Sequence, residues 1–188
     1  VSVGDNIVYK YDSVTVNVTV AKVPTEINIT NKTLDLKVNE EIDVGASLNP
    51  KDAPVDELIY TSGDENVVKI KNSKIIAAGE GSTVVTVSFK GNNKYAAAEN
   101  KTIKVSVGLN DACVNVSKNV YYINVGDNAT IHATATPGGL KVNFSTNDND
   151  IVSVDKDGNI MALGEGNATI TVSVGDNIVY KYDSVTVN

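Results

Sequence analysis

The sequence predicts an all-β protein built from two similar β-sandwiches in tandem. Val, Thr, Ile, Asn, Ser and Gly dominate the 188 residues, while Arg and Trp are absent, and this composition favours strands and turns over helices. Short runs of alternating apolar and polar residues recur about every 8 to 12 residues and are broken by Gly, Asn, Asp and Pro. The same succession of runs then occurs a second time along the chain.

The first copy of the pattern occupies residues 25–50, 57–89 and 100–107. Within it, Ile42, Val44, Ala46 and Leu48 alternate with polar residues and predict a strand with one apolar face. Such a face needs a second sheet to cover it, so the copy predicts two packed sheets.

The second copy occupies residues 112–137, 140–174 and 183–188, with a comparable alternation at Ile131, Ala133 and Ala135. The copies match at turns and core positions: Pro50 and Pro137, Tyr60 and Phe144, and the Gly-Glu-Gly triplets that start at Gly79 and Gly164. About seven strands in roughly 85 residues is typical of an immunoglobulin-like sandwich, here without paired cysteines or a buried Trp.

A longer repeat encloses these copies. Residues 1–17 and 172–188 share the identical sequence VSVGDNIVYKYDSVTVN, at an offset of 171 residues. We therefore expect one period of an array plus an overlap, with a terminal hairpin of the preceding repeat at 1–20 and domains at 21–108 and 109–188. Because a lone hairpin is marginal in water, we expect residues 1–17 to be frayed, to compete with 172–188 in a strand exchange, or to complete a domain of the preceding unit. We favour the last of these interpretations.

Two stretches resemble known repeats. GEGNATITVSV, preceded by NDIVSVDKDGNIMAL, resembles the bacterial immunoglobulin-like (group 2-like) repeats of intimin- and invasin-type surface proteins. KGNNKYAAAENKTIKVSV, which follows VAKVPTEINI, is similar to repeats in the large adhesin-like proteins of methanogenic archaea. The resemblance implies extracellular immunoglobulin-like modules on a cell surface, which serve as binding tips, spacers or fibre units alike. The family often carries Trp where this sequence has Tyr60 and Phe144.

The net charge and the cysteine count exclude several classes of partner and site. The chain has 16 basic and 23 acidic residues, a net charge of −7, which is the wrong sign for binding nucleic acid or anionic lipid. Cys113 is the single cysteine, so neither an intrachain disulfide nor a paired-thiolate metal site is expected. No apolar run approaches the roughly 20 residues of a membrane span.

No catalytic, cofactor or metal site is expected. His132 is the single histidine and is predicted to point away from the apolar face, so a nucleophile such as Cys113 has no evident base. Asp155–Asn159 and the Asn147–Asp150 run contain possible calcium ligands, but position 12 counted from Asp155 is Gly166 instead of Glu. The Asp-Gly-Asn sequence instead predicts a hairpin turn with Gly158 at positive φ.

Eight N-x-S/T sequons suggest N-glycosylation, and they are roughly twice as many as composition alone predicts. An equally weighted alternative is that Asn and Thr simply abound in turns and on polar strand faces. The sequons begin at Asn17, Asn28, Asn31, Asn100, Asn115, Asn128, Asn143 and Asn167.

The expected function is non-catalytic. Short links around Pro24 and after Gly108 favour an extended rod, and hence a shaft module of a cell-surface stalk or fibre whose partners are neighbouring repeats. The alternative is direct adhesion, in which sandwich loops such as the one opening at Lys90 bind a glycan or protein of a partner cell. The tyrosines available to stack on a sugar would be Tyr121, Tyr122, Tyr180 and Tyr182.

Overall fold

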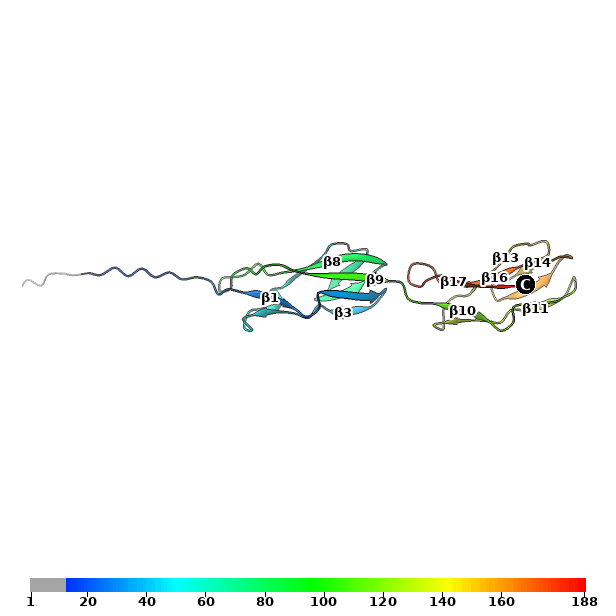
Figure 1. The fold of residues 1–188 in the computed structure, drawn as a ribbon, viewed down its shortest axis with the longest axis horizontal. Helices are drawn as coiled ribbons and strands as arrows, with labels where there is room; N and C mark the ends of the chain where they lie inside the picture. The colour runs from blue at the N-terminus through cyan, green and yellow to red at the C-terminus, as the bar shows by residue number, and fades with distance from the viewer. Residues whose placement is uncertain (1–12) are drawn as a thin grey trace, which may run out of the picture.

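The computed structural model describes residues 13–188 and confirms the all-β fold. Strands account for all regular structure in this range except a single 3₁₀ turn at Val55–Glu57. The strands form two sandwiches that lie end to end, preceded by an extended segment (Figure 1). Within residues 13–188, no helix is long and apolar enough to cross a membrane.

The first sandwich contains nine strands in three hydrogen-bonded sheets. The largest has the order β2-β9-β8-β5, and the others are β3-β7-β6 and β1-β4. The strands are β1 (Glu26–Ile29), β2 (Thr33–Lys37), β3 (Glu41–Asp43), β4 (Ala46–Asn49), β5 (Ile59–Ser62), β6 (Val68–Lys71), β7 (Lys74–Ala77), β8 (Gly81–Ser88) and β9 (Lys101–Gly108).

The central strand β9 is flanked on both sides. It pairs antiparallel with β8 and parallel with β2, where Leu34 lies opposite Val105 and Leu36 opposite Val107. Alternate residues of β9 therefore point into the sandwich, and Ile103, Val105 and Val107 are all buried.

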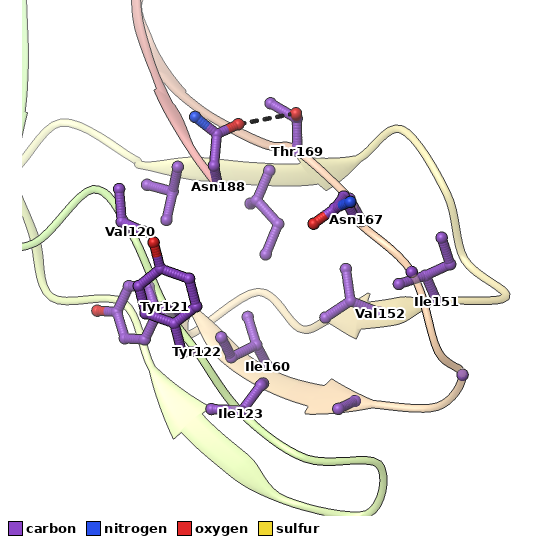
Figure 2. A pocket seen from close by; sticks show the side chains of 16 residues that line it. Val120, Tyr121, Tyr122, Ile123, Ile151, Val152, Ile160, Asn167, Thr169 and Asn188 are labelled. Carbon is purple, nitrogen blue, oxygen red and sulfur yellow. Dashed lines mark hydrogen bonds between the residues drawn. The ribbon is translucent and has the colours of Figure 1, made fainter.

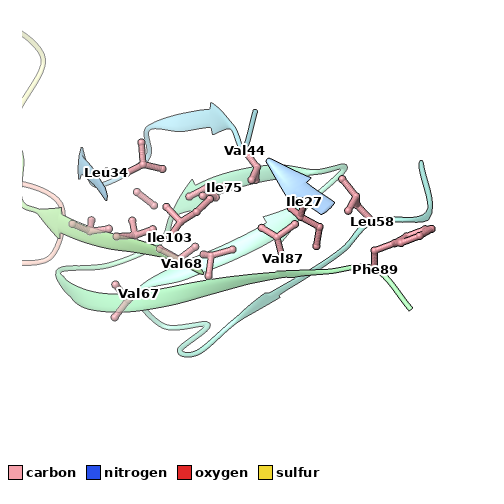
Figure 3. Packing of buried hydrophobic residues seen from close by; sticks show 14 of the residues in the cluster. Ile27, Leu34, Val44, Leu58, Val67, Val68, Ile75, Val87, Phe89 and Ile103 are labelled. Carbon is pink, nitrogen blue, oxygen red and sulfur yellow. The ribbon is translucent and has the colours of Figure 1, made fainter. Parts of the chain in front are cut away.

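The first core contains branched aliphatic side chains from all three sheets (Figure 3). Ile75, Val85 and Ile103 have no exposed surface, and Phe89 and Leu58 lie toward one end of the cluster. The predicted burial of Ile42, Val44, Ala46 and Leu48 is confirmed, since all four belong to this core or pack against it. The single strand predicted through them is wrong: the chain turns at Gly45, with φ of +62°, and the residues lie on β3 and β4, or between them, in two different sheets.

The second sandwich repeats this architecture with one strand fewer. Its sheets have the orders β13-β16-β17, β11-β15-β14 and β10-β12. The strands are β10 (Cys113–Val116), β11 (Asn128–Thr130), β12 (Ala133–Thr136), β13 (Asn143–Thr146), β14 (Val152–Val154), β15 (Asn159–Ala162), β16 (Ile170–Val174) and β17 (Asp183–Val187).

The two sandwiches have matching turns and core positions where the matched segments both form strands. The cis peptide bonds before Pro50 and Pro137 occupy the matched positions. The second core centres on Val172, Val174 and Val187, with Phe144 packed against it. The matched segment for β2, residues 120–124, forms no strand.

The extended segment Ser13–Lys22 takes part in no strand pairing within residues 13–188. Its valines are highly exposed, from 74% at Val16 to 88% at Val20. Most of the predicted hairpin at 1–20 lies outside the described residues, so it remains a prediction, as do the domain limits at 21–108 and 109–188. Leu109, placed first in the second domain, is buried in the first core.

Candidate functional site: a hydrogen-bonded joint and a groove

The loop between β16 and β17, residues 175–182, contacts the link between the two sandwiches, and we call it the joint loop. The joint is this loop together with the link residues Leu109, Asn110 and Asp111. Asn110 donates its backbone N–H to the Val179 carbonyl at 2.8 Å, and its own carbonyl accepts from the Lys181 N–H at 2.9 Å. The Asn110 side-chain amide also donates to the Val38 carbonyl at 3.0 Å, which lies in the first sandwich. One residue of the link is thus bonded to both sandwiches.

The same loop holds its own shape. The Asp176 carboxylate accepts three backbone N–H groups, from Ile178, Val179 and Tyr180. These bonds to the charged form lower the pKa of Asp176 below its usual value. Gly175, with φ of +86°, lets the chain turn where a side chain would collide with the Lys181 carbonyl.

Three charged side chains bridge the link. The Asp111 carboxylate lies 2.6 Å from the Lys181 ammonium and 3.6 Å from that of Lys37. The hydrogen bond from Lys181, together with the charges of both lysines, lowers the pKa of Asp111. Lys37 also donates to the Leu109 carbonyl at 2.8 Å. Because Asp111 is well exposed, these pairs fix orientation more than they add stability.

An apolar contact completes the joint. Leu109 is buried in the core of the first sandwich, and Val179 of the second sandwich packs against that same core. The link therefore has no freely rotating residue between Gly108, which ends β9, and Asn110, which pairs with the second sandwich.

The entry to the first sandwich uses the same arrangement. Val23 pairs in parallel with Tyr95, as Asn110 does with Tyr180. The Val23 N–H donates to the Lys94 carbonyl at 2.9 Å, and the Ala96 N–H donates to the Val23 carbonyl at 2.9 Å. The loop opening at Lys90, expected as a binding surface, thus holds the entering chain.

A groove of about 470 Å³ lies in the second sandwich beside the end of β17 (Figure 2). Its sides are the 120–123 and 151–152 segments, its floor includes Ile160, and Asn188 lies at one end. Tyr121 is held by a hydrogen bond from its hydroxyl to the Thr130 carbonyl at 3.0 Å. Most lining side chains are apolar, but polar atoms make up about as much of the lining surface as apolar atoms do, and no ionisable side chain other than tyrosine lines the groove.

All eight sequon asparagines are exposed, but they are dispersed over both sandwiches and the extended segment instead of gathering at one site. Asn167 lines the groove, while Asn17 lies in the extended segment. Their exposure fits glycosylation and equally fits polar strand faces, so modification stays a prediction.

His132 and Cys113, the residues considered for catalysis, lie on different segments. His132 is exposed, as predicted, between β11 and β12, and Cys113 is a free, exposed thiol on β10. The turn expected at Asp155–Asn159 is confirmed: Gly158 has a φ of +82°, and the Asp155 carboxylate accepts the Asp157 and Asn159 N–H groups. Across residues 13–188, no group of three or more His, Cys, Asp or Glu side chains is placed to hold a metal ion.

The four candidate tyrosines do not converge. Tyr121 and Tyr122 line the groove, whereas Tyr180 and Tyr182 belong to the joint loop at the other end of β17. Tyr122 is 93% exposed, and Tyr180 is half-buried against Asn110. The sequence predicted neither the joint nor the groove as a site, although the recurrence of GDNIVYKY at residues 4–11 and 175–182 marks the loop that forms the joint.

Residues 112–182 match the family model described as a bacterial Ig-like domain (group 2). The expected resemblance to bacterial immunoglobulin-like repeats is confirmed. The chain is also similar to an uncharacterised protein of Clostridium acetobutylicum, with 28% identity over 160 residues. That match covers 83% of this chain and 16% of the relative, so the chain spans less than a fifth of that protein's length.

Solved structures of similar arrangement include multidomain surface and adhesion proteins. Domains 4 and 5 of the S-layer protein SbsC are 20% identical, with 87% of this chain and 96% of that chain covered and a TM-score of 0.35. Drosophila N-cadherin EC1-4 is 14% identical, with 88% of this chain and 49% of that chain covered and a TM-score of 0.38. The insect immune protein hemolin is 14% identical, with 86% of this chain and 45% of that chain covered and a TM-score of 0.37. At these levels the likenesses add nothing to the assignment of a role.

Proposed function

We propose that this chain is a non-catalytic repeat module of an extracellular cell-surface stalk or fibre. The observation that carries the proposal is the joint, in which Asn110 is bonded to both sandwiches and Lys37, Asp111 and Lys181 bridge the link. A joint without a flexible residue holds modules in line, which a shaft requires and an independent binding domain does not.

The array supports the same role. The joint loop GDNIVYKY at Gly175–Tyr182 occurs unchanged at residues 4–11, so the sequence that forms this joint recurs with the 171-residue period. Since each unit contacts mainly its neighbours, an array of such units has nearly additive stability and grows in length by duplication. The partners are neighbouring repeats of the same protein, and the match to bacterial immunoglobulin-like domains fits a surface location.

Small-angle scattering of the chain tests the rod directly. We expect one extended conformation, with a maximum dimension that fits the two sandwiches end to end. A variant that removes the joint contacts, Asn110→Gly together with Asp111→Gly, should broaden the distance distribution while both sandwiches stay folded. An equally broad distribution for the unmodified chain would contradict a stiff shaft module.

Electron microscopy of the native surface, with antibody against this chain, tests the location. Labelling along filaments or stalks supports the proposal, whereas labelling inside the cell contradicts it. Intact-mass analysis of protein from the same source tests glycosylation, which we propose at one or more of the eight exposed sequons.

Direct adhesion is the second candidate, and the exposure of Tyr122 is the observation that favours it, because an exposed ring is the surface on which a sugar stacks. A glycan array probed with the chain and with Tyr122→Ala separates the roles. Binding that is lost in this variant and kept in Tyr182→Ala would favour adhesion over a purely structural shaft.

A further inference from the structure

The sheet β3-β7-β6 of the first sandwich turns one side toward the core and the other side outward. Ile42, Ile75 and Ile70 lie side by side across its three strands, and all three belong to the first core or pack against it. Because side chains alternate along a strand, the residues before and after these three point away from the core. They form the outward side of the sheet, which we call the outer face.

The outer face carries charges of opposite sign on its two edge strands. Strand register arranges six residues in two rows across the sheet, Glu41–Ile76–Lys69 and Asp43–Lys74–Lys71. Acidic side chains thus lie on β3 and basic side chains on β6, about 10 Å apart across the central strand β7. Ile76, in the middle of the face, is half-buried and lies outside the core.

The five charged side chains of the outer face are exposed, and none of them forms an ion pair within residues 13–188. Other charged residues of the chain do pair, as Lys37 and Lys181 do with Asp111. The carboxylates of β3 and the ammonium groups of β6 are therefore free to bind charges on another molecule.

The second sandwich has the same face without this charge pattern. Its matched rows are Asn128–Met161–Ser153 and Thr130–Asn159–Asp155. Asp155 is the one charged residue in them, and its carboxylate accepts the N–H groups of its own turn. Met161, at 45% exposed, is the counterpart of Ile76. The acidic strand, apolar centre and basic strand are thus specific to the first sandwich and do not follow from the fold.

We propose that the outer face of the first sandwich binds the outer face of a second copy of this chain, with β3 of each copy over β6 of the other. A two-fold axis that runs along β7 produces this arrangement, because it exchanges the two edges of the sheet and keeps the strand direction. Glu41 and Asp43 of each copy then face Lys69 and Lys71 of the other, and the two Ile76 side chains meet near the axis.

Face-to-face contact fits the sheet better than pairing of its edges. The edge strands are short, with three residues in β3 and four in β6, and lysine on an edge strand discourages a further strand from pairing there. The strands run along the length of the molecule, so the two copies lie side by side and point the same way (Figure 1).

A single pair of outer faces should bind weakly. Two rows of three residues are far fewer than the roughly 20 to 30 residues that each side of a stable interface contributes. In the expected array one such face recurs in every 171-residue period, and several weak contacts in register bind much more tightly than one.

The inference rests on the proposed function for its setting and deepens it by naming how stalks gather into a fibre. The two fail separately: a chain that never pairs sideways is still a stiff shaft module if its joint is intact, and a flexible joint leaves the outer face unchanged.

Sedimentation velocity of the chain over a range of concentrations measures the association. We expect a monomer–dimer equilibrium, since a two-fold contact closes on itself. Raising the salt from about 0.1 M to about 1 M shortens the screening length from about 10 Å to about 3 Å and should weaken the dimer by at least about tenfold. A chain that stays monomeric at low salt, oligomers that keep growing, or association that ignores salt overturns the proposal.

Charge-reversal variants identify the face. Lys69→Glu with Lys71→Glu makes both edges acidic, and Glu41→Lys with Asp43→Lys makes both edges basic. Each variant alone should self-associate at least about tenfold more weakly, whereas an equimolar mixture should form dimers again, because every acidic edge then faces a basic one. All four side chains are exposed, so folding is unaffected. Variants that still self-associate, or a mixture that stays monomeric, contradict the proposal.

The matched control reverses two exposed lysines away from the outer face. Lys51→Glu with Lys141→Glu changes the net charge as much as the reversal on β6 does, and should change association less than about twofold. A loss as large as that of the β6 variant would assign the effect to net charge and overturn the proposal.

Lys74 tests the position of the axis. It lies on β7, so the Lys74 side chains of the two copies approach each other, and Lys74→Ala should strengthen the dimer about two- to threefold by removing this repulsion. A weaker dimer would contradict an axis along β7.

Discussion

The two sandwiches share their topology and register, and they differ along one strand. β9 has eight residues and is paired on both sides along the second half of its length, whereas β17 has five and ends beside the groove. Ala77 is fully buried in the first sandwich, while the matched Ala162 borders the groove at 8% exposure. Residues 120–124, which match β2 in sequence, form no strand in the second sandwich, whereas β2 pairs with β9 along its whole length.

The largest effect that sharpens this comparison is expected from matched core truncations. Ile75→Ala should destabilise the first sandwich by about 3 to 5 kcal/mol, because Ile75 is fully buried in a closed core. Ile160→Ala, its counterpart on the groove floor, should cost about 2 kcal/mol, since the cavity it leaves opens into an existing groove. Urea unfolding followed for each sandwich measures both, and equal costs would contradict the comparison.

A smaller effect is expected from extending β17. Appending Val-Thr-Val-Ala-Lys after Asn188 reproduces residues 18–22, which follow the same 17-residue segment near the start of the chain, and burial of two valines together with new strand hydrogen bonds should offset the cost of ordering five residues and stabilise the second sandwich. The second unfolding transition should shift upward and the first should stay where it is. An extension with Asp in place of both valines is the matched control and should give no shift.

A single substitution in the joint loop should lower the stability of the second sandwich. Gly175→Ala places a Cβ against the Lys181 carbonyl at a φ of +86°, and we expect a cost of about 1 to 3 kcal/mol in the second sandwich. Gly108→Ala, on the other side of the link, has no heavy atom within 4 Å of the added Cβ and should cost little. Thermal unfolding of both variants checks the contrast.

The smallest effect is expected from pH. The pKa values of Asp111 and Asp176 are lowered in the folded chain, by Lys181 and by backbone N–H groups respectively. Their contribution is present above the unfolded pKa of about 4 and is lost as pH falls through the lower folded values. Below pH 4 the distance distribution from small-angle scattering should therefore broaden. Asp111→Asn should show part of that broadening at pH 7. A profile independent of pH from 7 to 3 would count against the ion pairs.

Local features could be predicted from the sequence because their causes are local. The turn at Gly158 follows from Asp-Gly-Asn between strand residues, and the burial of Val44 and Leu48 follows from alternation. The joint could not be predicted in the same way, since Lys37 and Lys181 lie 74 and 70 residues from Asp111 in the sequence and meet it only in the folded chain. The groove could not be predicted either, because its sides come from residues 120–123 and 151–152, which only the folded chain brings together.

The route of β9 has a mechanical consequence. Tension along the molecule enters the second sandwich through Leu109 and Asn110 and leaves the first through the end of β9, which runs parallel to β2 over five paired positions. A pull along parallel strands loads all the cross-strand hydrogen bonds together in shear, instead of breaking them one after another as in a peeled hairpin. The first sandwich is therefore built to resist extension along the axis of the molecule.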